Sequence, residues 1–112
     1  MAANSPAYQT LLDHTVDLRL AIQPDLITFS GHCLSEGLLS VNSEEEIRNI
    51  MLPEGERVAK LVELIQNKVL QSPRENYEKF MSILELDLRH YGAIIDKLKK
   101  TYLFRNGKFY FS

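Results

Sequence analysis

The sequence predicts an all-α fold of six helices in one domain. Apolar residues recur at intervals of three and four along most of the chain, which is the spacing that lines one face of a helix. All four prolines stand at the boundaries of these segments, where they do not interrupt a helix. A chain of 112 residues is also long enough to enclose one hydrophobic core.

The segment from Glu56 to Val69 has the most regular pattern, and we expect it to be the central helix. Its apolar stripe is too wide to be stable in water without packing against several neighbours. The stripe consists of Val58, Leu61, Val62, Ile65 and Val69, with Leu64 beside it. The residues expected to face outward are Arg57, Lys60, Glu63 and Lys68.

The first helix is predicted to begin with Ser5 as N-cap and Pro6 at the first helical position. Its expected inward residues are Tyr8, Leu11, Leu12, Thr15, Leu18 and Ile22. Pro24 separates it from a second helix, because the residue before a proline disfavours helical geometry. The inward residues of the second helix are Leu26, Ile27, Ser30, Cys33 and Leu34. Gly37 is predicted to end it in a left-handed conformation, with the two following leucines beneath the turn.

Two serines are predicted to cap the third and fifth helices. Residues 43–46 read Ser-Glu-Glu-Glu and residues 72–75 read Ser-Pro-Arg-Glu, so each serine precedes a glutamate by three positions. This spacing is typical of a capping box. The third helix is expected to be short and to end before Pro53. Its expected inward residues are Ile47, Ile50 and Met51.

The last two helices follow the same spacing. The inward residues of the fifth helix are Tyr77, Phe80, Met81, Leu84 and Leu88. A bend near Arg89 is expected to separate it from the sixth helix. The inward residues of the sixth helix are Tyr91, Ile94, Ile95, Leu98 and Tyr102.

The helical domain is predicted to span residues 1–103, and residues 104–112 to form an aromatic and basic tail or linker. Asn106 and Gly107 favour the two-residue turn of a hairpin, because both residues tolerate positive φ. An isolated hairpin is only marginally stable in water. We therefore expect a short C-terminal hairpin packed on the helices, or an extended tail that continues toward another domain or chain.

Composition and charge exclude several classes of protein. A formal net charge of -2 gives no general attraction to nucleic acid. No apolar run approaches the roughly 18 residues of a membrane span, and no secretory signal is visible at the N-terminus. The single Cys33 cannot form an internal disulfide, which favours a reducing environment. We expect a cytoplasmic protein with no membrane partner.

Residue types that serve as nucleophiles or metal ligands are sparse. Besides the carboxylates they are His14, His32, His90 and Cys33. Adjacent residues such as His32 and Cys33 point about 100° apart on a helix, so they form neither a catalytic dyad nor a metal clamp. The glycines are scattered and form no phosphate-binding loop. We therefore expect no enzymatic activity, no cofactor and no metal, and a core position for Cys33.

Charges are distributed unevenly along the chain. Between Glu36 and Glu56 the only basic residue is Arg48, so this tract is either a solvated face or a docking patch. A basic stretch near the C-terminus contains Lys97, Lys99, Lys100, Arg105 and Lys108. Basic residues interact favourably with a helix C-terminus, but a nucleic-acid interface is the alternative. That alternative is disfavoured because Tyr91 and Tyr102 share the buried stripe and are not free to stack on bases.

The order of these segments resembles the caspase recruitment domain of the death-fold superfamily, over about residues 8 to 103. The segments that carry the resemblance are residues 11–14, 34–40, 43–49, 56–62, 76–80 and 91–98. The resemblance implies an antiparallel six-helix Greek-key bundle whose first helix is kinked, here near His14 to Val16. It also implies a non-enzymatic adaptor that binds another such domain in apoptotic or innate-immune signalling.

The resemblance further implies two complementary charged patches. The acidic patch would lie on the second and third helices and contain Glu36, Glu44 and Glu45. The basic patch would lie on the first and fourth helices and contain Arg19, Arg57 and Lys60. The expected partner is another caspase recruitment domain, or a second copy in a head-to-tail oligomer. The alternatives are a death-fold adaptor for one heterologous partner and a helical nucleic-acid-binding module.

Overall fold

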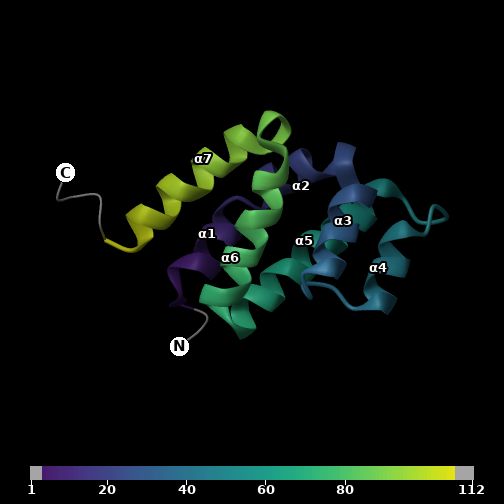
Figure 1. Cartoon of the computed structure of the whole chain (residues 1–112), viewed down its shortest axis with the longest axis horizontal. Coiled ribbons are helices and arrows are strands. Elements are labelled where there is room, and N and C mark those ends of the chain that lie inside the picture. Colours follow the sequence, from purple (N-terminus) through teal and green to yellow (C-terminus); the bar gives the residue numbers. More distant parts are fainter. Residues whose placement is uncertain (1–3, 108–112) are drawn as a thin grey trace.

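The computed structural model describes residues 4–107. Within this range the chain forms seven α-helices and no strand, which confirms the all-α prediction (Figure 1). The helices are α1 (Pro6–Asp13), α2 (Thr15–Ile22), α3 (Leu26–Ser35), α4 (Val41–Arg48), α5 (Glu54–Gln71), α6 (Pro73–Leu84) and α7 (Leu88–Arg105). The 3₁₀ turn η2 (Gln23–Asp25) joins α2 to α3, and η3 (Glu85–Asp87) joins α6 to α7.

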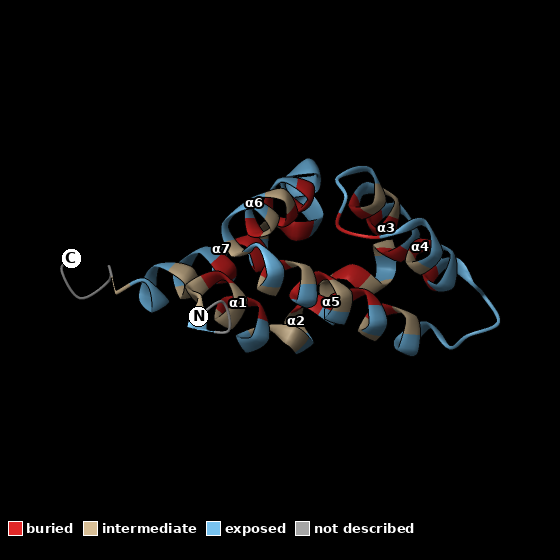
Figure 2. Ribbon diagram, turned by 90° about the horizontal axis from the view of Figure 1, so that it is seen from below, coloured by how far each residue is buried: buried red, intermediate tan, exposed pale blue. Residues whose placement is uncertain are grey.

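The central helix is α5, as predicted. It packs against α1, α2, α4 and α6. All five residues of its predicted stripe are buried, and Leu64 packs against the core from a partly buried position. Figure 2 shows the buried segments on the sides of the helices that face one another. The 3.6-residue period of this segment therefore identified the core correctly.

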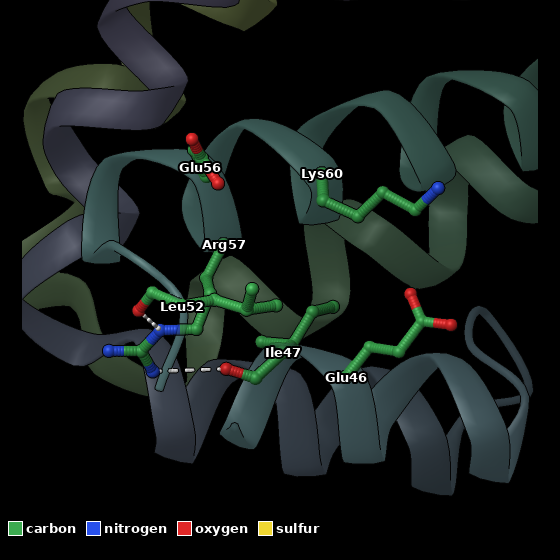
Figure 3. Close-up of a pocket in the computed structure, with 6 residues that line it drawn as sticks. All are labelled: Glu46, Ile47, Leu52, Glu56, Arg57 and Lys60. Atoms are coloured by element: carbon green, nitrogen blue, oxygen red, sulfur yellow. Dashed lines mark hydrogen bonds between the residues drawn. The ribbon is translucent and has the colours of Figure 1, made fainter. Parts of the chain in front are cut away.

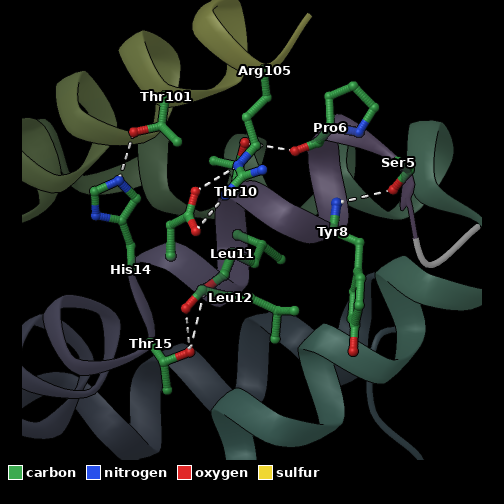
Figure 4. A network of polar contacts seen from close by, with 11 residues as sticks. Ser5, Pro6, Tyr8, Thr10, Leu11, Leu12, His14, Thr15, Thr101 and Arg105 are labelled. Carbon is green, nitrogen blue, oxygen red and sulfur yellow. Dashed lines mark hydrogen bonds and ion pairs between the residues drawn. The ribbon is translucent and has the colours of Figure 1, made fainter.

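The first helical segment is interrupted at His14, where the resemblance implied a kink. His14 separates α1 from α2 with φ -115° and ψ 26°, although neither proline nor glycine is present. The side-chain amide of Gln66 donates hydrogen bonds to the Leu11 carbonyl at 3.3 Å and to the Thr15 hydroxyl at 2.8 Å. The Thr15 hydroxyl in turn donates to the Leu12 carbonyl at 3.0 Å (Figure 4). These side chains satisfy carbonyls that the break leaves without helical partners.

The start of α1 is confirmed, but one inward residue is not. Ser5 Oγ accepts a hydrogen bond from the Tyr8 amide at 3.0 Å, and Pro6 is the first helical residue. Leu11 is fully buried, whereas Leu12 is 39% exposed. The break at His14 shifts the helical phase between α1 and α2, so one stripe cannot include every apolar residue of both.

In α3 the buried face is rotated relative to the prediction. Leu26 and Cys33 are buried as expected, but Phe29 is buried and Ile27 is 46% exposed. Phe29 packs edge-on to Phe80 of α6, with ring centroids 6.0 Å apart. The larger aromatic side chain thus occupies the core position. Gly37 has φ 78° and ends the turn after α3, and the two leucines that follow it are buried, as predicted.

The predicted capping box at residues 43–46 is wrong. The N-cap of α4 is Ser40, whose hydroxyl accepts the Ser43 amide at 3.1 Å. Ser43 therefore lies inside the helix. Ser40 has extended backbone angles, φ -79° and ψ 162°, which suit an N-cap. The residue three positions after Ser40 is a serine instead of a glutamate, so Ser40 does not match the capping-box pattern.

The predicted cap at Ser72 is correct in position but not in bonding. Ser72 precedes Pro73 at the start of α6, yet its side chain accepts no capping hydrogen bond. The Asn76 side chain instead donates to the Lys68 carbonyl at 2.7 Å, which ties the start of α6 to the end of α5. The break after α6 lies at residues 85–87 instead of near Arg89.

The predicted inward positions of Ile50, Met51 and Leu88 are also wrong, because all three are at least 62% exposed. The first two lie in the loop between α4 and α5, and Leu88 begins α7 after the 3₁₀ turn. A helical period no longer predicts side-chain direction once the helix has ended. The prediction for the last helix is confirmed. Its inward residues Tyr91, Ile94, Ile95 and Leu98 are buried, and Tyr102 is partly buried.

The predicted hairpin at the C-terminus is wrong for the residues that the structure describes. Leu103, Phe104 and Arg105 belong to α7, so the domain boundary placed after residue 103 falls within a helix. Gly107 has φ 70°, and its amide donates to the Phe104 carbonyl at 3.0 Å. Asn-Gly tolerates positive φ, which serves a helix C-cap as well as a hairpin turn. The second strand predicted after Gly107 lies outside the described residues.

Candidate interaction surfaces

Arg57 was expected to face outward in the basic patch, but it turns toward the loop after α4. Its Nε donates to the Leu52 carbonyl at 3.1 Å, and its Nη1 donates to the Ile47 carbonyl at 3.0 Å (Figure 3). The last turn of a helix leaves backbone carbonyls without helical partners, and the guanidinium satisfies the Ile47 carbonyl there together with the Leu52 carbonyl in the following loop. Arg57 therefore holds α5 to α4 and its loop.

Glu44 was expected to be exposed in the acidic patch, but only 6% of its surface is accessible. It precedes the buried Ile47 by three residues, so the two side chains share one face of α4. Its carboxylate lies 3.6 Å from the Arg48 guanidinium. Glu44 is therefore engaged within α4, and the spacing to Ile47 was the sequence signal for its burial.

The four remaining residues of the predicted patches are exposed. They are Glu36, Glu45, Arg19 and Lys60. Glu36 follows α3 and Glu45 lies on α4, and these two helices pack together. Arg19 lies on α2 and Lys60 on α5, which also pack together. Within residues 4–107 none of the four forms an ion pair, so each patch retains two uncompensated side chains.

A groove of about 230 Å³ lies between α4 and α5. It is lined by Glu46, Ile47, Leu52, Glu56, Arg57 and Lys60. Figure 3 shows Glu46 and Lys60 extending from the two helices toward the same end of the groove. Lys60 thus stands among acidic as well as basic neighbours, which makes the basic patch less uniform than the sequence indicated.

The basic stretch near the C-terminus is partly neutralised by contacts with the start of the chain. Arg105 donates two hydrogen bonds to the Asp13 carboxylate, at 2.6 and 2.7 Å (Figure 4). The hydrogen bond from Arg105 lowers the pKa of the Asp13 carboxyl below its ordinary value. Lys97 lies 3.8 Å from the Asp17 carboxylate. These contacts join α7 to α1 and α2 and leave fewer basic groups for nucleic acid, and Lys108 lies outside the described residues.

His14 strengthens the same connection. Its Nε2 is hydrogen-bonded to the Thr101 hydroxyl at 2.7 Å (Figure 4). Its Nδ1 is hydrogen-bonded to the Asp17 carboxylate at 3.1 Å. The residue that interrupts the first helical segment therefore also contacts α7. This histidine has a structural position at the junction of three helices.

The candidate chemical residues do not assemble into a site. Cys33 is fully buried, and burial raises the pKa of its thiol, whereas the neighbouring His32 is exposed. A buried thiol with a raised pKa is a poor nucleophile. Within residues 4–107 no group of three His, Cys, Asp or Glu side chains is arranged to hold a metal ion.

One surface was missed by the sequence analysis, and it consists of apolar residues. Ile50 and Met51 are 83% and 85% exposed, and Leu52 and Ile27 are 41% and 46% exposed. The sequence signal was three apolar residues in succession immediately before Pro53. The sequence does not distinguish this run from Leu38 and Leu39, which also lie between two helices and are buried.

None of the helices within residues 4–107 combines the length and the apolar character that a membrane crossing demands. Comparison of the chain with protein-family models, with curated proteins and with solved structures found no match. The resemblance to caspase recruitment domains therefore rests on the order of the sequence segments.

Proposed function

We propose that this chain is a non-enzymatic interaction module that assembles with a second copy, or with a domain of similar fold, through complementary charges. The observation that carries the proposal is the pair Glu45 and Lys60, which are exposed on α4 and α5 and form no ion pair within residues 4–107. Opposite charges on two helices of one molecule allow a head-to-tail contact that repeats.

The resemblance to caspase recruitment domains gives this module a specific form. If α1 and α2 are counted as two halves of one interrupted helix, the described chain has the six segments that the resemblance implies. The interruption at His14 supports this grouping. The bundle would then have the antiparallel Greek-key order, and its partner would be a caspase recruitment domain in an apoptotic or innate-immune pathway.

Hydrogen bonds and ion pairs within the chain reduce the number of residues that each patch can offer to a partner. Glu44 and Arg57 are engaged by Arg48 and by backbone carbonyls, so we remove them from the interface. The acidic surface then contains Glu36 and Glu45, and the basic surface contains Arg19 and Lys60. A side chain that already has partners must lose them before it can bind another molecule, which reduces its contribution to affinity.

Charge reversal on two separate preparations tests the proposal. We expect Glu45→Lys and Lys60→Glu each to weaken assembly when tested alone, because like charges across an interface cost several kcal/mol. Mixed together, the two variants should regain one contact of reversed polarity. The matched control is Glu85→Lys, which reverses an exposed charge on η3 and should assemble like the parent.

Sedimentation velocity gives the assembly state, and circular dichroism establishes that each variant is folded. If folded Glu45→Lys and Lys60→Glu both assemble like the parent, the charge contact does not exist. If the mixture associates no more strongly than either variant alone, Glu45 and Lys60 do not meet each other across the interface.

A further inference from the structure

An exposed apolar loop joins α4 to α5, and the chain holds it in a fixed shape. We define the apolar loop as Ile50, Met51 and Leu52, which follow α4. The amide of Met51 donates to the Asn49 side chain at 3.0 Å. Arg57 donates to the Leu52 carbonyl, which fastens the other end of the loop to α5. A loop that is already ordered loses little conformational entropy when it binds.

An apolar groove lies between α6 and α7. This α6–α7 groove has a volume of about 270 Å³. Its lining residues are Tyr77, Met81, Lys99, Tyr102 and Leu103. A water molecule in the liquid occupies roughly 30 Å³, so the groove has room for a large side chain. Tyr77 and Tyr102 stack with ring centroids 5.0 Å apart and form an aromatic wall.

The loop and the groove cannot meet within one molecule. The protein measures 49 Å along its longest axis, and the loop after α4 lies at one end of that axis while the C-terminal part of α7 lies at the other (Figure 1). Contact between two different surfaces is heterologous and can repeat from one copy to the next.

Charge also matches between these two surfaces. The apolar loop is followed by the exposed Glu54 and Glu56, whereas Lys99 lies on the wall of the α6–α7 groove. Opposite charges beside an apolar contact favour the correct orientation of two molecules and disfavour others. The shared apolar character and the opposite charges identify a second copy of this chain as the occupant.

We propose that the apolar loop of one copy docks in the α6–α7 groove of the next copy. This inference rests on the proposed function, because the partner is a second copy, but it is tested at Met51 and Leu103 instead of at Glu45 and Lys60. Met51 is the most exposed residue of the loop and enters the groove against Tyr77 and Tyr102.

The experiment is performed on full-length protein that also carries Glu45→Lys, so that the charge contact is disabled and any remaining association reports the loop and the groove. Met51→Asp and Leu103→Asp are added separately; these residues are 85% and 42% exposed, so both variants should fold. The control is Leu86→Asp on η3, where the leucine is 67% exposed.

Sedimentation velocity should show that Met51→Asp and Leu103→Asp each weaken the remaining association at least about tenfold, because an unpaired carboxylate is costly in an apolar contact. Leu86→Asp should leave it unchanged. A mixture of Met51→Asp and Leu103→Asp should form one-to-one dimers and nothing larger, because a single functional loop and a single functional groove remain.

Four results would overturn the inference. The first is that the Glu45→Lys parent is monomeric at every concentration, and the second is that both aspartate variants associate like this parent. The third is that the mixture fails to form dimers. The fourth concerns residues 108–112: if their removal tightens or abolishes association, the groove or the contact belongs to that segment, whereas unchanged association supports the second copy. If wild-type assembly depends on Glu45 and Lys60 but not on Met51 and Leu103, the proposed function stands without this contact.

Discussion

At the scale of single residues, the helical period predicted the direction of the Cβ atoms on α5 but not the position of the charged group at the end of a long side chain. The apolar stripe of α5 is buried as expected, because short apolar side chains follow the direction of their Cβ atoms. Arg57 starts on the expected side of α5, yet its guanidinium reaches the carbonyls of Ile47 and Leu52. Long side chains can bury their stems and place their polar heads elsewhere.

We expect Leu61→Ala to lower the free energy of unfolding by about 2 to 5 kcal/mol, through lost burial and a cavity in the core. Leu61 is fully buried on the central helix. The matched control is the neighbouring exposed residue: Lys60→Ala should change stability by no more than about 0.5 kcal/mol. Urea denaturation measures both. Equal effects of the two substitutions would mean that the face of α5 is assigned incorrectly.

Ser40→Ala should lower stability by about 0.5 to 2 kcal/mol, because the Ser40 hydroxyl accepts the Ser43 amide at the start of α4. Ser43→Ala removes only the exposed hydroxyl that accepts from Ser40 at 3.0 Å and keeps that amide bonded, so its effect should be smaller than that of Ser40→Ala. Thermal unfolding of the two variants decides between the caps. A larger loss for Ser43→Ala would restore the capping box that the sequence predicted.

At the scale of elements, the differences from prediction occur where helices end. The pattern Ser-x-x-Glu at residues 43–46 was a valid capping signal, but Ser40 competes with it and begins the helix three residues earlier. The same limit explains the loop after α4 and the C-terminus of α7, where Asn-Gly supports either a hairpin turn or a helix cap. Local sequence leaves such alternatives open, and packing against the rest of the chain selects one.

The loop between α4 and α5 depends on Arg57. We expect Arg57→Ala to lower the free energy of unfolding by about 1.5 to 3 kcal/mol, since hydrogen bonds to a charged group are lost and two carbonyls lose their donors. Arg57→Lys should restore little of this, because an ammonium group does not reproduce the fork of a guanidinium. Hydrogen exchange should show faster opening of residues 47–53 in both variants. Unchanged exchange there would show that the guanidinium does not hold the loop.

The contact between α1 and α7 should make stability depend on acidity. The Arg105 hydrogen bond lowers the pKa of Asp13 in the folded protein below its ordinary value of 3.8. The folded state therefore releases this proton more readily than the unfolded state, and the stabilisation is present above about pH 4 and is lost as the pH falls through the folded pKa. Asp13→Asn should reduce the decrease in the free energy of unfolding as the pH falls below about 4. The exposed control on α7, Asp96→Asn, should leave that decrease unchanged. If Asp13→Asn leaves the loss of stability at acidic pH unchanged, the ion pair between Asp13 and Arg105 does not stabilise the protein.

At the scale of the whole molecule, the sequence predicted the helical class, the central helix and the separation of most helices. Hydrophobic periodicity and prolines determine these features locally. The kink at His14 was implied by resemblance, and its cause is tertiary, because Gln66 of α5 bonds the carbonyl that the kink releases. Four of the six predicted patch residues are exposed, namely Glu36, Glu45, Arg19 and Lys60. Glu44 pairs with Arg48 within α4, and Arg57 bonds carbonyls that only the folded chain brings near. The apolar loop was missed because its residues were assigned to a helix that ends earlier.

Self-association through complementary charges can be measured by light scattering after size-exclusion chromatography. Wild-type protein is measured over a range of concentrations at about 0.15 M and 1 M salt, where electrostatic interactions are screened over about 8 Å and 3 Å. We expect a mass that rises above the 12.9 kDa of one chain as concentration increases, and that is lower in the higher salt at equal concentration. A mass of one chain under every condition, or an assembly that salt does not weaken, would contradict it.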